Sequence, residues 1–239
     1  MRFRFRSRRS DDRERRHLRL VTLYDPRSPL SEAYRTVRTN LTFAAVDKPI
    51  QSLMIGSALP GEGKSTTTSN LAVTFAQSGK KTLIVDADLR KPTLHYYFRA
   101  MDHVGLTNVL IGGATIEEAV QETDVPGLSL LTAGPIPPNP SELLASQAMR
   151  RLVTRLYERY DLVIFDSPPL LAVSDAQIIS SFVDGVVLVI KAHATRREHV
   201  LKAKDLLTKA NAHVLGVVLN QKRRERDGDY AYYRYYVKV

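Results

Sequence analysis

A chain of 239 residues is long enough for one domain with a sizeable hydrophobic core, and a hydrophobic content of 44% is ordinary for a globular protein. The chain has no cysteine, which excludes disulfides and thiolate metal sites and is typical of a reducing compartment. We expect no membrane span, because no apolar run approaches ~18 residues, and no secretory signal, because no apolar stretch follows the Arg-rich start.

The net charge of +10 is concentrated at the two ends. Residues 1–19 contain nine Arg against three acidic residues, and residues 221–239 contain six Lys or Arg against three, which leaves +1 for the rest. Residues 1–22 have little to bury and are predicted to form a disordered basic arm. Such an arm can bind anionic lipid headgroups or nucleic acid, or it can simply be solvated.

A helix is expected over residues 28–43, with Ser28 or Ser31 as its cap. Its apolar residues fall on one stripe that should face the core: Leu30, Ala33, Tyr34, Val37 and Leu41. The other side carries a charged row directed outward: Glu32, Arg35 and Arg38. This row is either a solvated face with weak i,i+3 pairs or a contact surface for another subunit.

From residue 50 onward, apolar runs alternate with helical patterns. The expected strands are 51–57, 81–86, 128–132, 161–166, 185–191 and 214–220. The expected helices lie near 64–78, 92–99, 115–121, 141–159, 174–182 and 196–211. Runs that are apolar on both faces indicate strands buried between layers of helices. Residues 23–220 are therefore predicted to form one α/β domain, a doubly wound, mostly parallel sheet flanked by helices, with ligands bound at the carboxyl ends of its strands.

Residues 58–65, Ala-Leu-Pro-Gly-Glu-Gly-Lys-Ser, fit the phosphate-binding loop of a P-loop NTPase-like fold, between a strand and a helix. Gly61 and Gly63 let backbone N–H groups close around phosphate oxygens. Lys64 is expected to reach the β- and γ-phosphates, and the Ser65 hydroxyl to ligate Mg²⁺. The predicted nucleotide-binding residues in this stretch are Pro60, Gly61, Glu62, Gly63, Lys64, Ser65 and Thr66.

Two further strands end in carboxylates. Asp86 and Asp88 follow the run at 82–85, and Asp166 ends the run at 162–165. A carboxylate at the end of a buried strand beside a phosphate loop is suited to Mg²⁺, directly or through water. We therefore predict a metal site at Ser65, Asp88 and Asp166.

Together these motifs resemble the Walker A, A′ and B motifs of the bacterial tyrosine kinases of capsule and exopolysaccharide synthesis. The stretch 134–144 before a helix is also similar to that family, and the resemblance extends over residues 28–239. By this resemblance, the cofactors are ATP and Mg²⁺, and the catalytic residues are Lys64, Asp86, Asp88 and Asp166. Asp86 would accept the tyrosine proton.

The resemblance also implies roles for residues outside the phosphate loop. The row Glu32, Arg35 and Arg38 is similar to the motif that joins subunits into a ring, an octamer in the family. Asn220, at the end of the last expected strand, is either a contact for adenine or an ordinary turn residue.

The C-terminal residues 221–239 are predicted to be a flexible tail. Five tyrosines lie within seven positions: Tyr230, Tyr232, Tyr233, Tyr235 and Tyr236. In the family such a cluster is phosphorylated by a neighbouring subunit. The alternative is an aromatic tail that binds a partner or nucleic acid by stacking.

The resemblance places the protein in the cytoplasm, at the inner face of the membrane, where it would regulate polysaccharide synthesis and export. The expected partners are a membrane-embedded polysaccharide co-polymerase that activates the kinase and a cognate tyrosine phosphatase. The basic arm could add contact with the inner leaflet. Nucleic acid is not expected as a partner.

Two alternatives stay open. A partition or cell-division ATPase shares the fold, but such proteins carry a second lysine near the start of the loop, where this chain has Leu59, and they lack a tyrosine tail. The other alternative is a nucleotide-gated scaffold of a polysaccharide export complex.

Overall fold

The computed structural model describes residues 20–44 and 49–222. The basic arm up to residue 19 and the tyrosine cluster at 230–236 lie outside the described residues, so the statements about both stay predictions. Within the described ranges, no helix combines the length and the apolar character that crossing a bilayer requires.

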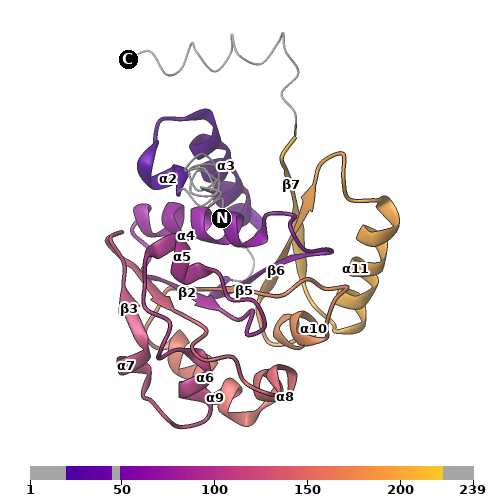
Figure 1. The fold of residues 1–239 in the computed structure, drawn as a ribbon. Coiled ribbons are helices and arrows are strands. Elements are labelled where there is room, and N and C mark those ends of the chain that lie inside the picture. The colour runs from indigo at the N-terminus through magenta and orange to yellow at the C-terminus, as the bar shows by residue number, and fades with distance from the viewer. Residues whose placement is uncertain (1–19, 45–48, 223–239) are drawn as a thin grey trace, which may run out of the picture.

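One sheet runs through the described part of the chain, in the order β3-β4-β2-β5-β1-β6-β7 (Figure 1). Its strands are β1 (Ser52–Ser57), β2 (Thr82–Asp86), β3 (Val120–Glu122), β4 (Leu128–Leu131), β5 (Leu162–Asp166), β6 (Gly185–Lys191) and β7 (Val214–Asn220). All neighbouring strands are parallel except β3 and β4. The ends of β2, β5 and β1 therefore lie next to one another at the carboxyl edge, where ligands bind in such sheets.

Helices cover both faces of the sheet (Figure 1). They are α2 (Val21–Tyr24), α3 (Pro29–Ala44), α4 (Lys64–Gln77), α5 (Leu94–Phe98), α6 (Leu106–Leu110), α7 (Ile116–Ala119), α8 (Pro140–Ala145), α9 (Gln147–Tyr157), α10 (Asp175–Ser180) and α11 (Arg197–Lys209). One buried apolar cluster packs the sheet against α6 to α11, and a second packs the other face against α3, α4 and α5. The prediction of a doubly wound, mostly parallel sheet is confirmed.

Two stretches differ from the predicted secondary structure. The helix predicted at 115–121 ends at Ala119, and the next three residues form β3 by pairing with the edge of β4. The helix predicted at 141–159 is divided in two at Ser146. The Ser146 hydroxyl accepts the N–H of Met149 at 3.2 Å and caps α9, so the break has a local cause.

Two short helices, α2 and α6, have no counterpart in the prediction. Helix α2 begins inside the range 1–22 that was predicted to be disordered. Leu20 and Thr22 are buried, so the end of that range belongs to the folded domain. The backbone N–H and the hydroxyl of Thr22 donate to Asn70 Oδ1 at 3.1 and 2.9 Å, and Gln77 Nε2 donates to the Thr22 carbonyl. These partners on α4 are distant in sequence, which is why local composition misplaced the boundary.

Helix α3 agrees with the helix predicted at 28–43, and Ser28 is its cap because its hydroxyl accepts the N–H of Ser31. The buried stripe differs in part. Tyr34 and Leu41 are buried and Val37 is half-buried, whereas Leu30 and Ala33 are exposed. Ser31 occupies the inward position instead, because its hydroxyl donates to the carbonyls of Val21 and Asp25.

The charged row on α3 is outward only in part. Glu32 and Arg35 form an i,i+3 ion pair of 2.8 Å. Arg38 instead donates to the carbonyl of Thr74 on α4 at 2.9 Å, so the expectation that it points outward with the other two is wrong. The role of this row in oligomerisation stays a prediction.

Candidate active site

The predicted phosphate loop joins β1 to α4 at the carboxyl edge of the sheet. Gly61 and Gly63 have φ angles of +77° and +94°, in the left-handed region that favours glycine. Helix α4 begins at Lys64, so its N-terminal N–H groups start directly at the loop. A pocket of about 1050 Å³ opens here, lined by the loop and by residues that follow β2, β5 and β7.

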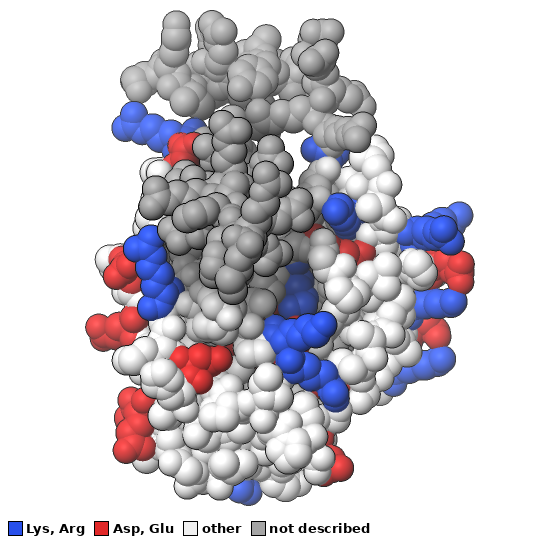
Figure 2. All heavy atoms as spheres, viewed as in Figure 1, with Lys and Arg blue, Asp and Glu red and all other residues white. Residues whose placement is uncertain are grey.

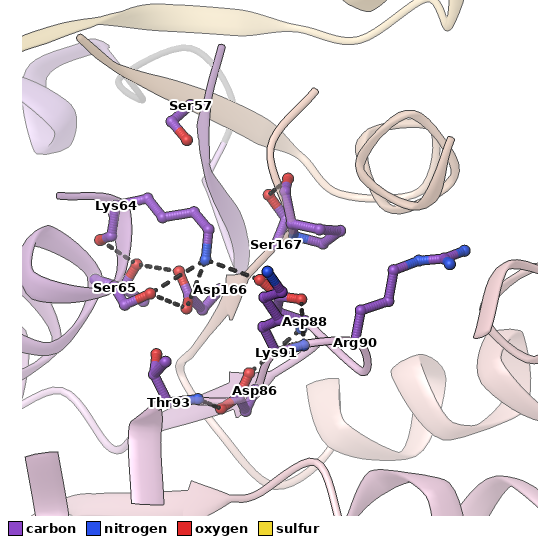
Figure 3. Close-up of polar contacts among 12 residues, drawn as sticks. Ser57, Lys64, Ser65, Asp86, Asp88, Arg90, Lys91, Thr93, Asp166 and Ser167 are labelled. Atoms are coloured by element: carbon purple, nitrogen blue, oxygen red, sulfur yellow. Dashed lines mark hydrogen bonds and ion pairs between the residues drawn. The ribbon is translucent and has the colours of Figure 1, made fainter. Parts of the chain in front are cut away.

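Two of the predicted carboxylates meet the lysine of the loop (Figure 3). Lys64 Nζ lies 3.2 Å from Asp88 Oδ2 and 3.3 Å from Asp166 Oδ2. The Ser65 hydroxyl donates to Asp166 Oδ2 at 2.6 Å. Thr68 Oγ1 donates to Asp166 Oδ1 at 3.0 Å, a contact that the sequence analysis missed. The available signal was its position four residues after Lys64, on the same face of the helix.

Asp86 lies fully buried at the end of β2, opposite Asp166 in the register of the sheet. Its Oδ2 accepts the N–H groups of Thr93 and Leu94, both at 2.9 Å. Burial, reinforced by the charge of Asp166, raises the pKa of Asp86 to about 8. Burial also raises the pKa of Asp166.

The lysine of this cluster is surrounded by acidic side chains. Burial acts to lower the pKa of Lys64, but the charges of Asp166, Asp88 and Asp86 outweigh it and raise that pKa, so the amine stays protonated. Asp88 and Asp166 thus share the ammonium of Lys64, and these oxygen donors beside the Ser65 hydroxyl suit Mg²⁺.

The protein groups alone do not enclose a metal ion. Across residues 20–44 and 49–222, no group of three or more His, Cys, Asp or Glu side chains is placed to hold one. Mg²⁺ commonly takes one or two carboxylates and completes its shell with water and substrate phosphates. Ser65, Asp88 and Asp166 therefore fit a Mg²⁺ that is shared with a nucleotide.

Comparison with known proteins identifies the family. A family model described as an AAA domain matches residues 51–209, more than half of the chain. Tyrosine-protein kinase YwqD of Bacillus subtilis (strain 168) is 50% identical over 214 residues, which cover 90% of each chain. The chain belongs to the bacterial tyrosine-protein kinase family.

Solved structures agree with this family assignment. The kinase domain of the Escherichia coli tyrosine kinase ETK has a TM-score of 0.84 and 35% identity, covering 88% of this kinase and 83% of that chain. The chimerical protein CapA2B2 has a TM-score of 0.83 and 44% identity, covering 86% and 90%. The prediction of a tyrosine kinase with a P-loop NTPase-like fold is confirmed at the level of the family.

The division-ATPase alternative fits less well. The septum site-determining protein MinD of Pyrococcus horikoshii, solved with Mg-ADP, has a TM-score of 0.63 and 26% identity, covering 79% of this kinase and 78% of that chain. That likeness is to the shared nucleotide-binding fold, whereas the similarity to the tyrosine kinases is greater in both sequence and structure.

Most of the predicted nucleotide-binding residues of the kinase border the pocket: Pro60, Gly61, Gly63, Lys64, Ser65, Thr66 and Asn220. Glu62 does not border it, because its side chain is turned away and the residue is only 3% exposed. Asn220 Nδ2 donates to the Glu62 carbonyl at 2.9 Å and so holds the loop. The contact of Asn220 with adenine stays a prediction.

Several residues that border the pocket have partners that the local sequence does not reveal. Arg90 borders the pocket and forms a two-pronged ion pair, at 2.9 and 3.1 Å, with the buried carboxylate of Asp175. It also donates to Ser141 Oγ at 3.0 Å, which links the end of β2 to α8 and α10. The Thr66 and Tyr97 hydroxyls lie 2.7 Å apart. These pairs join residues that are distant in the sequence, so no local pattern predicts them.

The remaining predicted site residues do not meet this cluster. The row Glu32, Arg35 and Arg38 lies on α3 and is not part of the pocket lining. The five tail tyrosines lie outside the described residues.

Replacing Gly63 with Ala is expected to damage the loop more than replacing Gly61. A Cβ on Gly63 would lie 2.0 Å from Asn220 Nδ2, whereas a Cβ on Gly61 would meet no atom within 4 Å. Alanine is strained in the left-handed region at both positions. At Gly63 it must also displace the Asn220 side chain, which breaks the hydrogen bond from Asn220 to the Glu62 carbonyl. We expect Gly63→Ala to weaken ADP binding roughly tenfold more than Gly61→Ala, by titration with a fluorescent ADP analogue. Equal weakening would contradict this role of the clash.

Asp86 is expected to make the nucleotide-free protein less stable as the pH rises. Its pKa of about 8 in the folded state exceeds the ordinary 3.8, so between these values the folded chain keeps a proton that the unfolded chain has lost. The stability it contributes is present below pH 3.8 and lost towards pH 8, with a slope of at most about 1.4 kcal/mol per pH unit. Urea unfolding of Asp86→Asn should show a flatter dependence than wild type. An unchanged slope would contradict this assignment.

Proposed function

We propose that this protein is an ATP-dependent kinase that phosphorylates tyrosines in the C-terminal tail of a neighbouring copy, and so regulates the synthesis and export of exopolysaccharide or capsule. The observation that carries this proposal is the 50% identity to a tyrosine-protein kinase over 90% of both chains. The lysine and carboxylate cluster in the pocket supports it, and the sequence supplies five acceptors at 230–236.

The residues around the pocket have the chemistry that phosphoryl transfer needs. Lys64 and the N-terminal N–H groups of α4 would hold the phosphates and stabilise the charge that develops on them. Ser65, Asp88 and Asp166 would hold Mg²⁺, which neutralises phosphate charge when it is bound. Because Lys64 pairs with these same carboxylates, binding of Mg-ATP would exchange one set of ion pairs for another.

Asp86 is proposed to accept the proton of the acceptor tyrosine. With a pKa of about 8, a fraction of the Asp86 side chains is deprotonated near neutral pH, and this fraction can act as a general base. Asp88 borders the pocket, whereas Asp86 is fully buried behind it. The proposed role therefore requires that Asp86 become accessible when Mg-ATP binds.

The test of the proposed function is the position of the phosphate. After incubation with Mg-ATP, mass spectrometry of the C-terminal peptide should find phosphate on residues 230–236. A variant with all five tail tyrosines replaced by Phe should carry none there, yet should bind ADP as the wild type does. If the wild-type tail stayed unphosphorylated even with a candidate activator present, the proposal would be wrong.

The distribution of charge bears on the class of partner. On the face shown in Figure 2, Lys and Arg side chains of the described residues are interspersed with Asp and Glu. This agrees with the near-neutral charge between the two basic ends of the sequence. Nucleic-acid binding favours a basic stripe or groove, so the described face gives no support for it. We propose instead that the basic arm contacts the anionic inner leaflet.

The proposed setting is the cytoplasmic face of the cell membrane. There, a membrane-embedded polysaccharide co-polymerase would activate the kinase, and a cognate tyrosine phosphatase would reverse the reaction. The likeness to CapA2B2 favours a partner that contacts the kinase directly, because a chimerical protein joins parts of different proteins in one chain. Subunits are proposed to assemble into a homo-oligomeric ring, an octamer by family resemblance, through Glu32, Arg35 and Arg38.

A further inference from the structure

The acidic residue of the phosphate loop has an unexpected position. The carboxylate of Glu62 would repel phosphate if it faced the pocket, but it is folded beneath the loop and only 3% of the residue is exposed. Its Oε2 accepts the N–H of Leu59 at 2.9 Å, while the Ser57 hydroxyl donates to the Leu59 carbonyl at 2.9 Å. Both backbone groups of Leu59 are therefore fixed, one of them by Glu62.

The other oxygen of Glu62 is held by a residue that is distant in sequence. The Thr195 hydroxyl donates to Glu62 Oε1, and it accepts the N–H of Lys191. Thr195 lies in the turn between β6 and α11, and its own N–H donates to the Lys191 carbonyl at 3.0 Å. The loop is thus tied through one carboxylate to the end of a neighbouring strand.

A third contact holds the same residue from another side. Asn220 Nδ2, at the end of β7, donates to the Glu62 carbonyl at 2.9 Å. Glu62 therefore connects the outer turn of the loop with the ends of β6 and β7. Backbone N–H groups that are held in place before a ligand arrives bind it at a lower cost in ordering.

We propose that Glu62 and Thr195 are positioning residues, which preorganise the backbone of the loop for the phosphates of a nucleotide. The inference rests on the proposed function only in that the loop binds nucleotide. It is independent of whether the phosphoryl group goes to tyrosine or to water. It also assigns a role to the turn at 191–196, which lies outside the phosphate loop.

The test uses ADP, so that binding is read without turnover. Thr195→Val removes the hydroxyl that holds Glu62 Oε1 and should raise the dissociation constant of a fluorescent ADP analogue roughly tenfold. Thr195→Ser keeps a hydroxyl and should stay within about twofold of wild type. Thr82→Val is the matched control, because Thr82 is buried and its hydroxyl donates to the Lys80 carbonyl, but it lies at the opposite end of the sheet. It should lower thermal stability without changing ADP affinity.

Turnover and a second variant separate positioning from a general loss of structure. In Thr195→Val, KM for ATP should rise while kcat at saturating ATP stays within about twofold, because the lost contact preorganises binding.

Glu62→Gln should weaken ADP binding similarly, and the double variant should bind ADP no more weakly than the weaker single variant, since both substitutions act through one contact. The proposal is overturned if Thr195→Val binds ADP like wild type, if Thr195→Ser is as weak as Thr195→Val, or if Thr82→Val weakens binding equally. If the wild type showed no tail phosphorylation while the variants showed the expected effects on ADP binding, the proposed kinase function would be refuted and the role of Glu62 and Thr195 would stand.

Discussion

Replacing Lys64 with Met is expected to lower the rate of tail phosphorylation by about 10²- to 10³-fold. Met keeps the length and the apolar stem of the side chain, but it removes the charge that would stabilise the transferring phosphoryl group. It also leaves Asp88 and Asp166 without their cation. The measurement is the initial rate of phosphotyrosine formation at saturating Mg-ATP.

A matched control for this variant is Lys209→Met. Lys209 on α11 loses the same charge, but its partner is Asp205 in an exposed i,i+4 pair, which contributes little. Its rate should stay within about twofold of wild type. A rate for Lys64→Met within about tenfold of wild type would contradict the assignment of Lys64 to the phosphates.

Asp166→Asn is expected to separate activity from stability. The substitution removes a proposed Mg²⁺ ligand, so the rate should fall about 10²-fold or more and should need more Mg²⁺ for half-saturation. The thermal stability of the nucleotide-free protein should rise or change little. Burial raises the pKa of Asp166, which means that its charge is disfavoured in the folded state, and Asn carries no charge.

The measurements for this variant are a Mg²⁺ titration of the initial rate and thermal unfolding without nucleotide. Asp205→Asn is the control, because Asp205 pairs only with exposed Lys209 at the surface in the described contacts. An Asp166→Asn protein that kept its activity, or that kept the Mg²⁺ dependence of wild type, would contradict the metal assignment.

Elements that depend on their own local sequence were predictable, whereas elements that depend on partners distant in the sequence were not. Strands such as β2 and β5 were predictable because each is a short apolar run buried on both faces. Strand β3 was not, because its three residues are strand only through pairing with β4. Helix α2 depends in the same way on Thr22 finding Asn70 on α4.

The same distinction holds for the residues of the site. The phosphate loop and the carboxylates were predictable because a fixed spacing places them at strand ends, and the structure brings Lys64, Asp88 and Asp166 together. The outward orientation assigned to Arg38 was wrong, because the carbonyl of Thr74 is a tertiary partner that no local pattern reveals. Thr195 was missed for the same reason, since its contact with Glu62 spans 133 positions.

Transfer between copies of the chain is tested most directly by mixing two complementary full-length variants with Mg-ATP. One carries Lys64→Met with its tail tyrosines intact, and the other keeps Lys64 but has Phe at 230, 232, 233, 235 and 236. We predict that neither variant alone gains phosphate in the tail and that the mixture gains phosphate on the tail of the Lys64→Met copy. A mixture without tail phosphate, under conditions in which the wild type phosphorylates its own tail, would contradict transfer between subunits.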